Sequence, residues 1–240
     1  MKINITRYGT RALRIVWPPQ IDEDILQEIV QFTRALKNGS YKIEDIHHGY
    51  HELLVQYNKT ISNFELLKTQ LLAIYQNRKV SLKKPATLWH IPACFDQDFA
   101  PDLAEYLLRK KLTKEQLVAL HTQPLYTVYF IGFLPGFLYL GGMDQQLNLA
   151  RKSTPSRLIK RGTIAVGGEQ TGVYPQDSPG GWYGIAHTPI SFFDAKSKIP
   201  CWAKPGDKVR FYAIDRDELH SMTKAVSAGN FLIKSELYEG

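Results

Sequence analysis

Glycine and aromatic residues alternate closely in Phe130-Ile131-Gly132-Phe133-Leu134-Pro135-Gly136-Phe137-Leu138-Tyr139-Leu140-Gly141-Gly142, in the second half of the chain. Two further segments have the same character: residues 167–175 (GGEQTGVYP) and residues 178–182 (SPGGW). Eleven of the 17 glycines lie between positions 132 and 184. Because glycine lets the backbone approach a ligand or another strand closely, this density indicates either the corners of a β-barrel or the loops of a pocket.

Short apolar runs separated by turns surround these three segments. The predicted strands include residues 125–134, 164–166, 185–187, 190–193 and 209–214. This spacing is typical of a barrel or a sandwich. One helical passage, residues 102–120, precedes them and is broken near Leu112-Thr113, where Thr113 and Gln116 predict a capping box.

Residues 1–84 show a different pattern, two rounds of strand, strand and helix. Asp22-Glu23-Asp24 favours the start of the first helix because negative charge opposes the helix macrodipole. Ser62, with Glu65 three residues later, predicts a capping box for the second. The chain is therefore predicted to be α+β, with a small two-layer ββαββα domain at residues 1–84, a linker near Lys83-Lys84-Pro85, and a β-rich domain at residues 85–240.

The composition is that of a globular protein: 44% of the 240 residues are hydrophobic and 22% are charged, which excludes disordered, collagen-like and coiled-coil classes. Cys94 and Cys201 are too few for a disulfide framework, so both are expected to pack in a reducing compartment. The N-terminus lacks the apolar stretch of a signal peptide, and no apolar run approaches the roughly 18 residues needed to span a bilayer. These features predict a cytoplasmic protein without a membrane partner.

The formal net charge of +7 is spread thinly, which indicates a solvated surface, so nucleic acid is not an expected partner. One local exception exists. The window between Asp144 and Glu169 contains no acidic residue and five cations: Arg151, Lys152, Arg157, Lys160 and Arg161. This window predicts an anion-binding site beside the glycine-rich segments.

Histidines supply the remaining candidates for chemistry. His47, His48 and His51 span a predicted hairpin turn, where adjacent side chains point to opposite faces, so no metal site is predicted there. His121 precedes a buried strand and is the candidate catalytic residue, as a general base or ligand-orienting group; the alternative is a histidine bonded to backbone at a helix end. The chain has no phosphate-loop, G-x-G-x-x-G, G-x-S-x-G, H-E-x-x-H or C-x-x-C motif.

The glycine-rich segments also carry a resemblance. Residues 132–137 (GFLPGF), 168–175 and 178–182, with weaker likeness at residues 90–94, 100–103, His121 and 204–211, resemble the family of 5-oxoprolinase B subunits, also called allophanate hydrolase subunit 1, which includes KipI-like kinase inhibitors. The resemblance implies a cyclophilin-like β-barrel in the second domain. It implies a component of an ATP-dependent 5-oxoprolinase complex that opens 5-oxo-L-proline to L-glutamate. The component would work with the A and C subunits of that complex, the latter homologous to this chain, and would be inactive alone. ATP would bring Mg²⁺ through its phosphates.

From the residues and the resemblance together, two sets of site residues are predicted. Substrate or nucleotide would contact Arg151, Arg157, Lys160, Gln170, Thr171, Tyr174 and Ser178. The pocket wall would comprise Phe133, Pro135, Phe137, Tyr139 and Trp182. The alternative is that these aromatic side chains fill the barrel core.

The chain departs from the family pattern at residues 150–163 and 94–97. In the first of these segments the cation after the second proline, Arg157, has moved by one position, which would reverse its face on a strand. The rival function is a KipI-like inhibitor that binds a proline-containing segment of a sensor histidine kinase. A third is a barrel that only completes a partner's active site. All of these would use the same pocket.

Overall fold

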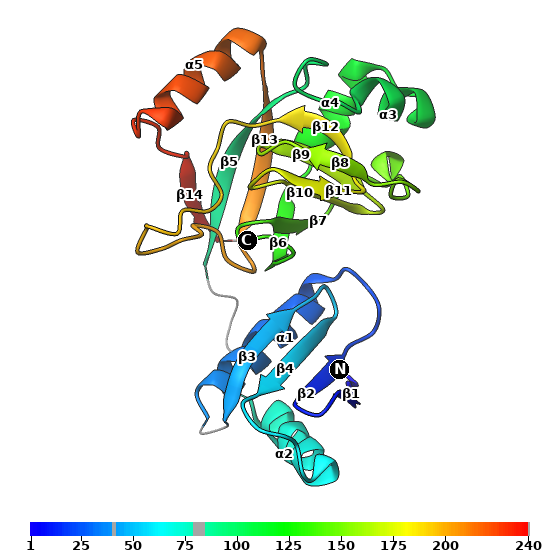
Figure 1. Ribbon diagram of the computed structural model, residues 1–240, viewed down its shortest axis with the longest axis vertical. Coiled ribbons are helices and arrows are strands. Elements are labelled where there is room, and N and C mark those ends of the chain that lie inside the picture. Colours follow the sequence, from blue (N-terminus) through cyan, green and yellow to red (C-terminus); the bar gives the residue numbers. More distant parts are fainter. Residues whose placement is uncertain (40–41, 79–84, 240) are drawn as a thin grey trace. The chain divides into compact units, whose positions relative to one another are not determined.

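The chain divides into two units, Met1–Lys84 and Pro85–Gly240, each with its own apolar core. The computed structural model describes residues 1–39, 42–78 and 85–239. Two residues of the predicted linker, Lys83 and Lys84, lie outside this range. Figure 1 labels the elements of both units.

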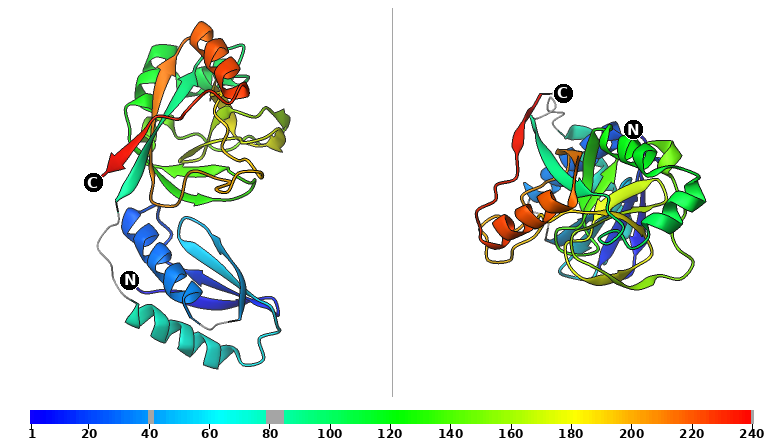
Figure 2. Two further views of the ribbon diagram at one scale, coloured as in Figure 1. Left: turned by 90° about the vertical axis from the view of Figure 1, so that its left-hand side faces the viewer. Right: turned by 90° about the horizontal axis from the view of Figure 1, so that it is seen from above.

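The N-terminal unit is a four-stranded antiparallel sheet with two helices. Its elements are β1 (Asn4–Tyr8), β2 (Ala12–Val16), α1 (Glu23–Lys37), β3 (Ile43–His48), β4 (Glu52–Tyr57) and α2 (Phe64–Asn77). The strand order is β1-β2-β4-β3. Alternate residues of β2 and β4, among them Leu13 and Val55, are buried against α1 and α2, and Figure 2 shows both helices on one side of the sheet. The predicted ββαββα arrangement is confirmed.

The helix starts follow from their capping residues. Asp22 caps α1 as predicted, because its side chain accepts the backbone N–H groups of Asp24 and Ile25. The prediction for α2 was wrong: its cap is Asn63, whose side chain accepts the N–H of Leu66. Asparagine is at least as good a cap as serine, so the helix begins one residue later than Ser62 would place it.

The second unit is built on a closed barrel. Its elements are β5 (Ala86–Cys94), α3 (Leu103–Lys110), α4 (Lys114–Thr122), β6 (Tyr126–Ile131), β7 (Leu138–Gly141), the 3₁₀ turn η1 (Gln145–Leu147), β8 (Ser156–Ile159), β9 (Thr163–Gly167), β10 (Gln170–Val173), β11 (Ser178–Gly180), β12 (Tyr183–His187), β13 (Lys208–Ile214), α5 (Arg216–Ser227) and β14 (Ser235–Tyr238). Strands run in the order β12-β9-β10-β7-β6-β13-β5, and the pairing of His187 with Cys94 closes the ring. The second unit is therefore a barrel and not a sandwich.

Three strands of this unit lie outside this ring. β14 pairs with the first half of β5, and β8 and β11 form a separate two-stranded ribbon. The predicted break in the helical passage is confirmed: α3 ends at Lys110, and α4 starts with the Thr113–Gln116 capping box. No helix in the described part of the chain is both long and apolar enough to cross a membrane.

Two predictions for the second unit were wrong or missing. Residues 190–193 are not a strand, although Ile190 and Phe192 are buried, because they lie in an extended loop that covers the core. Helix α5 was not predicted; Leu219 is its one buried residue, and Met222, packed beside it, is only partly buried. Its one clear signal is the capping box between Asp215 and Glu218.

The turn between β6 and β7 ends in a proline–glycine pair. The N–H of Phe137 donates to the carbonyl of Leu134 (3.0 Å), with Pro135 and Gly136 at the central positions and φ of +85° at Gly136. This is the arrangement of a type II turn, which requires positive φ at its third residue. A Cβ at Gly136 would lie 2.7 Å from Cβ of Phe193.

We predict that Gly136→Ala destabilises the protein much more than Gly206→Ala. Both glycines have positive φ, +85° and +95°, but a Cβ at Gly206 meets nothing within 4 Å. Gly206→Ala should therefore cost only the backbone strain, about 1–2 kcal/mol. Gly136→Ala should cost about 1–3 kcal/mol more through overpacking. Urea unfolding of both variants measures the difference, and equal costs would contradict the close approach at Gly136.

Candidate functional site

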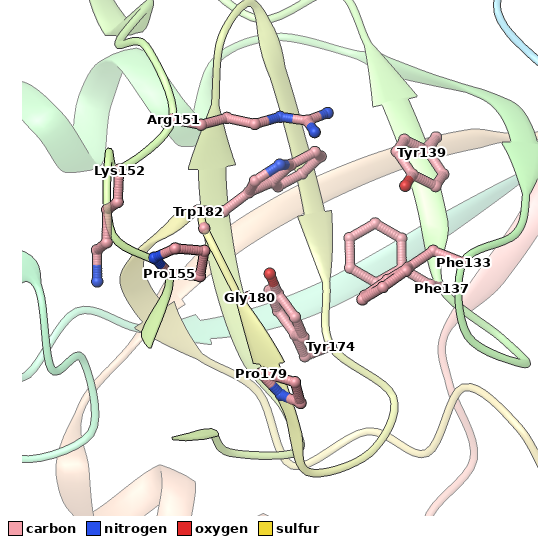
Figure 3. A pocket seen from close by; sticks show the side chains of 11 residues that line it. Phe133, Phe137, Tyr139, Arg151, Lys152, Pro155, Tyr174, Pro179, Gly180 and Trp182 are labelled. Carbon is pink, nitrogen blue, oxygen red and sulfur yellow. The ribbon is translucent and has the colours of Figure 1, made fainter. Parts of the chain in front are cut away.

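One cavity of about 360 Å³ opens where the glycine-rich segments of the barrel unit meet. The residues that line it are Phe133, Phe137, Tyr139, Arg151, Lys152, Pro155, Tyr174, Pro179, Gly180, Gly181 and Trp182. They come from the β6–β7 turn, the start of β7, the segment before β8, the end of β10, and the β11–β12 connection. Figure 3 shows the side chains arranged around this space.

The aromatic walls are held by one another at nearly right angles. The Phe137 ring lies edge-to-face with Tyr174 (5.2 Å between centroids, 90°) and with Trp182 (5.5 Å, 79°). Tyr139 meets Trp182 in the same way (5.8 Å, 86°). Each such contact stabilises the arrangement beyond its apolar burial, by about 0.5–1.5 kcal/mol. The walls are therefore rigid before any ligand arrives.

At two glycines the rings pack directly against the backbone. A Cβ on Gly167 would lie 2.4 Å from the Trp182 indole, and a Cβ on Gly180 would lie 2.2 Å from the Tyr174 hydroxyl. A side chain at either position would displace the ring beside it. Gly167 lies in the barrel strand β9 and Gly180 in the β8–β11 ribbon, so glycines of both parts shape the pocket.

Two phenol groups face this site. Burial raises the pKa of Tyr174 to about 12, and burial also raises the pKa of Tyr139. Both hydroxyls therefore stay protonated near neutral pH. They can donate or accept hydrogen bonds, but they cannot serve as anionic bases.

The two cations of the pocket differ in what holds them. The Arg151 guanidinium lies 5.6 Å from the centroid of the Trp182 ring, over the aromatic wall, as Figure 3 shows. Within the described residues Arg151 makes no ion pair. The Lys152 ammonium points to the other side and pairs with Asp102 (2.5 Å). Arg151 therefore supplies the positive charge that is available to a ligand.

The Asp102 carboxylate links Lys152, in the segment before β8, to Gly184 in β12. It occupies the N-cap position of α3, yet its carboxylate makes no bond to that helix. One oxygen accepts from Lys152, and the other accepts the backbone N–H of Gly184 in β12 (2.7 Å). The Lys152 ammonium also donates to Ser156 (2.8 Å), and the Lys152 backbone N–H donates to Gly181 (2.8 Å). Residues 151–156 are thereby fixed against the β11–β12 connection.

Several predicted anion-binding residues lie elsewhere. Arg157 is exposed on β8 and does not line the cavity. The Lys160 ammonium pairs with Asp177 (2.9 Å) at the surface. The structure thus brings Arg151, but neither Arg157 nor Lys160, to the pocket.

The predicted hydrogen-bonding residues are also divided. Tyr174 lines the pocket, whereas Gln170, Thr171 and Ser178 do not. Thr171 is fully buried in β10 and donates to the Ala165 carbonyl (3.0 Å). Of the predicted walls, Phe133, Phe137, Tyr139 and Trp182 line the cavity, and Pro135 is exposed in the turn beside it.

His121 is buried inside the barrel with no exposed surface. Its Nε2 lies 3.2 Å from the Thr171 hydroxyl, and its ring packs against Phe211 (4.8 Å between centroids). Burial lowers the pKa of His121 to about 3, so the ring is neutral in the folded protein. A residue enclosed in this way cannot touch a substrate, which leaves it a role in the core.

The other histidines behave as the hairpin predicts. His47 is exposed beside Asp45 (3.6 Å), whereas the half-buried His48 contacts the Thr33 hydroxyl (3.2 Å) on the opposite face of β3. Among the residues that the structure describes, no group of three or more His, Cys, Asp and Glu side chains could hold a metal ion.

Lys152, Pro155 and Asp102 are site residues that the sequence pattern did not single out. In the sequence Lys152 is only one of five cations in its window. Its partner Asp102 lies 50 residues away in the chain, and no spacing rule connects the two. The signal that could have found them is the chemical one: a lysine and an aspartate inside a largely apolar pocket region must be paired.

Comparisons with known proteins show which proteins this chain is similar to. The family model described as "Carboxyltransferase domain, subdomain C and D" matches residues 3–203. The chain is 40% identical over 131 residues to the 5-oxoprolinase B subunit of Bacillus subtilis (strain 168), a match that covers 55% of each chain. It is 31% identical over 209 residues to the 5-oxoprolinase B subunit of Haemophilus influenzae, covering 87% of this chain and 97% of that one.

The fold has solved counterparts. The K. lactis urea amidolyase superposes over 98% of this chain with a TM-score of 0.84 and 17% identity, and the match covers 16% of that longer chain. At this identity the likeness concerns the fold alone. The match to the B. subtilis relative spans about half of that protein's length.

We predict that Asp102→Asn destabilises the protein by about 3–5 kcal/mol. The side chains of Asp102 and Lys152 are 14% and 13% exposed, so the substitution leaves the lysine charge buried without a partner. The double variant Asp102→Asn/Lys152→Met should recover most of the loss because it removes that charge. Urea unfolding measures all three proteins. A single-variant loss below about 1 kcal/mol would contradict a buried, structural ion pair.

We predict that the protein loses stability as pH falls from about 6.5 toward the folded-state values. The pKa values of His121 and His48 are lowered to about 3 and about 4, so the unfolded chain binds protons that the folded chain refuses. His121 alone should account for about 2 kcal/mol between pH 7.5 and 5. Denaturant unfolding at both pH values measures the slope, and His121→Gln should flatten it. Equal wild-type stability at both values would refute the prediction.

Proposed function

This chain belongs to the 5-oxoprolinase B-type family of carboxyltransferase-domain proteins, and on that premise we propose that it is a component of an ATP-dependent amidohydrolase complex that opens 5-oxo-L-proline to L-glutamate. The relatives named as B subunits of 5-oxoprolinase support this assignment. A component of this kind acts with others, so we expect no activity from this chain alone.

The observation that carries the proposal is an aromatic cavity with one available cation. 5-Oxo-L-proline is a small, flat lactam ring that bears one carboxylate. Arg151 can bind a carboxylate through paired hydrogen bonds, which are stronger than neutral ones. The aromatic lining offers apolar surface to the ring of the ligand, and the hydroxyls of Tyr139 and Tyr174 can reach its polar edge.

The lactam amide itself is a poor electrophile, and ATP would supply the activation by phosphorylating the amide oxygen, which would then leave as phosphate. A triphosphate carries several negative charges, whereas Lys152 is already neutralised by Asp102 and Lys160 by Asp177. The residues of this pocket therefore do not fit a triphosphate. We place ATP and its Mg²⁺ on another protein of the complex. This chain then binds the ring substrate and orients its amide for attack by water.

The test is reconstitution with the candidate A and C subunits, measuring 5-oxoproline-dependent ATP hydrolysis and glutamate formation while each protein is omitted in turn. We expect both activities to disappear when this chain alone is left out. A folded, assembled complex without either activity would overturn the proposal. Inhibition of a sensor histidine kinase by the same preparation would then favour the KipI-like alternative.

We predict that Arg151→Ala raises the KM for 5-oxo-L-proline by roughly 10- to 100-fold in that complex. The loss of a charged hydrogen bond to a carboxylate accounts for about 1.5–3 kcal/mol. Arg157→Ala is the matched control, because Arg157 belongs to the same cationic window but lies outside the cavity. Its KM should stay within about twofold of wild type. Equal effects of the two substitutions would remove Arg151 from the site.

A further inference from the structure

Phe133 combines an unfavourable backbone with an exposed aromatic ring. Its φ is +66°, a region that bulky L-residues rarely occupy. Of the described residues other than glycine, Lys111 also has positive φ, but Lys111 is the left-handed C-cap that ends α3. No helix end explains the conformation of Phe133.

The local hydrogen bonds show where the strain arises. The N–H of Leu134 donates to the carbonyl of Gly132 (2.8 Å), so Phe133 is the central residue of a three-residue turn. With positive φ at its centre, this is the rare and strained form of the γ-turn. In the next turn Gly136 occupies the position of positive φ, whereas at position 133 a phenylalanine stands where glycine would be free of strain.

Without a ligand, the Phe133 ring gains little apolar burial in this position. Phe133 is 62% exposed, whereas Phe137, Tyr174 and Trp182, three of the other rings of the pocket, are at most 4% exposed. Its contacts are two edge-to-face approaches, to Phe137 (5.8 Å) and to Tyr174 (6.5 Å). The ring thus stands at the lip of the cavity, and Figure 3 shows it beside the space that the other rings enclose. Strain kept at a binding site points to function.

We propose that Phe133 is a specificity-determining residue whose ring closes over one face of the ligand, and that the ligand class is a small ring compound with a single carboxylate. Arg151, the unpaired cation among the described lining residues, fixes the charge of the ligand at one. The apolar walls and the exposed ring require a flat, weakly polar body. This inference rests on the proposed function in that 5-oxo-L-proline is one member of the class.

The strain is tested by comparing Phe133→Gly with Phe133→Ala, since both variants lose the ring and only glycine relieves the backbone. At an ordinary φ the glycine variant would be the less stable of the two. Here we expect its Tm to exceed that of the alanine variant by about 2–4 °C. An alanine variant that is equally or more stable would overturn the claim of strain.

The ligand class is tested by calorimetric titration of the full chain, alone and in the reconstituted complex, with 5-oxo-L-proline, benzoate and the neutral lactam 2-pyrrolidinone. We expect wild type to bind at least one of the two carboxylates saturably, and the neutral lactam at least tenfold more weakly. Both Phe133 variants should bind the carboxylate at least tenfold more weakly than wild type. Leu158→Ala, which removes an exposed apolar residue of β8 outside the cavity, should bind it like wild type.

The outcomes separate this inference from the proposed function. Binding of benzoate that depends on Phe133, with no binding or turnover of 5-oxo-L-proline, would support the inference and defeat the proposed function. Turnover of 5-oxo-L-proline by the complex with an unchanged KM in Phe133→Gly would support the proposed function and overturn the inference about Phe133. No saturable binding of either carboxylate by wild type would overturn the inference.

Discussion

The ion pair between Asp102 and Lys152 determines where the parts of the pocket lie. Asp102 stands where an aspartate would ordinarily cap its own helix, but its carboxylate reaches β12 at Gly184 and the segment before β8 at Lys152. Three segments that are distant in the sequence are joined in this way. The position of Arg151 depends on this ion pair, because its neighbour Lys152 is held in place. The position of Trp182 depends on it as well, because Trp182 lies two residues before Gly184. Asp102 also neutralises the charge of Lys152, so the positive charge that remains for a ligand is that of the Arg151 guanidinium.

The pocket is consequently rigid on most sides and adjustable on one. Phe137, Tyr174 and Trp182 support one another edge-to-face and rest on glycine backbone, so they have little freedom to move. Phe133 also meets Phe137 and Tyr174 edge-to-face, but its ring is 62% exposed and its backbone is strained. A preformed apolar box with a single cation suits a small ring anion and not a polyphosphate. This division agrees with the proposed role as one part of a larger enzyme and with the proposal that ATP binds to another protein of the complex.

Rules that act within a few residues predicted many of the helices and strands. Features that depend on contacts between distant parts of the chain could not be predicted in this way. Asp22 and the Thr113–Gln116 box act within one helical turn, so composition and spacing were enough to find them. The prediction of a strand at residues 190–193 was wrong because a loop that covers the core has the same apolar pattern as a buried strand. In the site, the aromatic walls were recognisable because glycine and aromatic residues share short segments. Among the predicted cations Arg151 lines the cavity, but Lys160 does not, because it pairs with Asp177. That pair and the pair of Lys152 with Asp102 form only once the chain has folded.

We propose that this chain itself holds a ring carboxylate between Arg151 and Phe133, and a crystal structure with 5-oxo-L-proline would show this binding. We expect the ligand carboxylate within about 3 Å of the Arg151 guanidinium, the distance of a charged hydrogen bond, with the lactam ring between Trp182 and Phe133. A ligand bound elsewhere, or a cavity that stays free of 5-oxo-L-proline while the rest of the fold is unchanged, would contradict it.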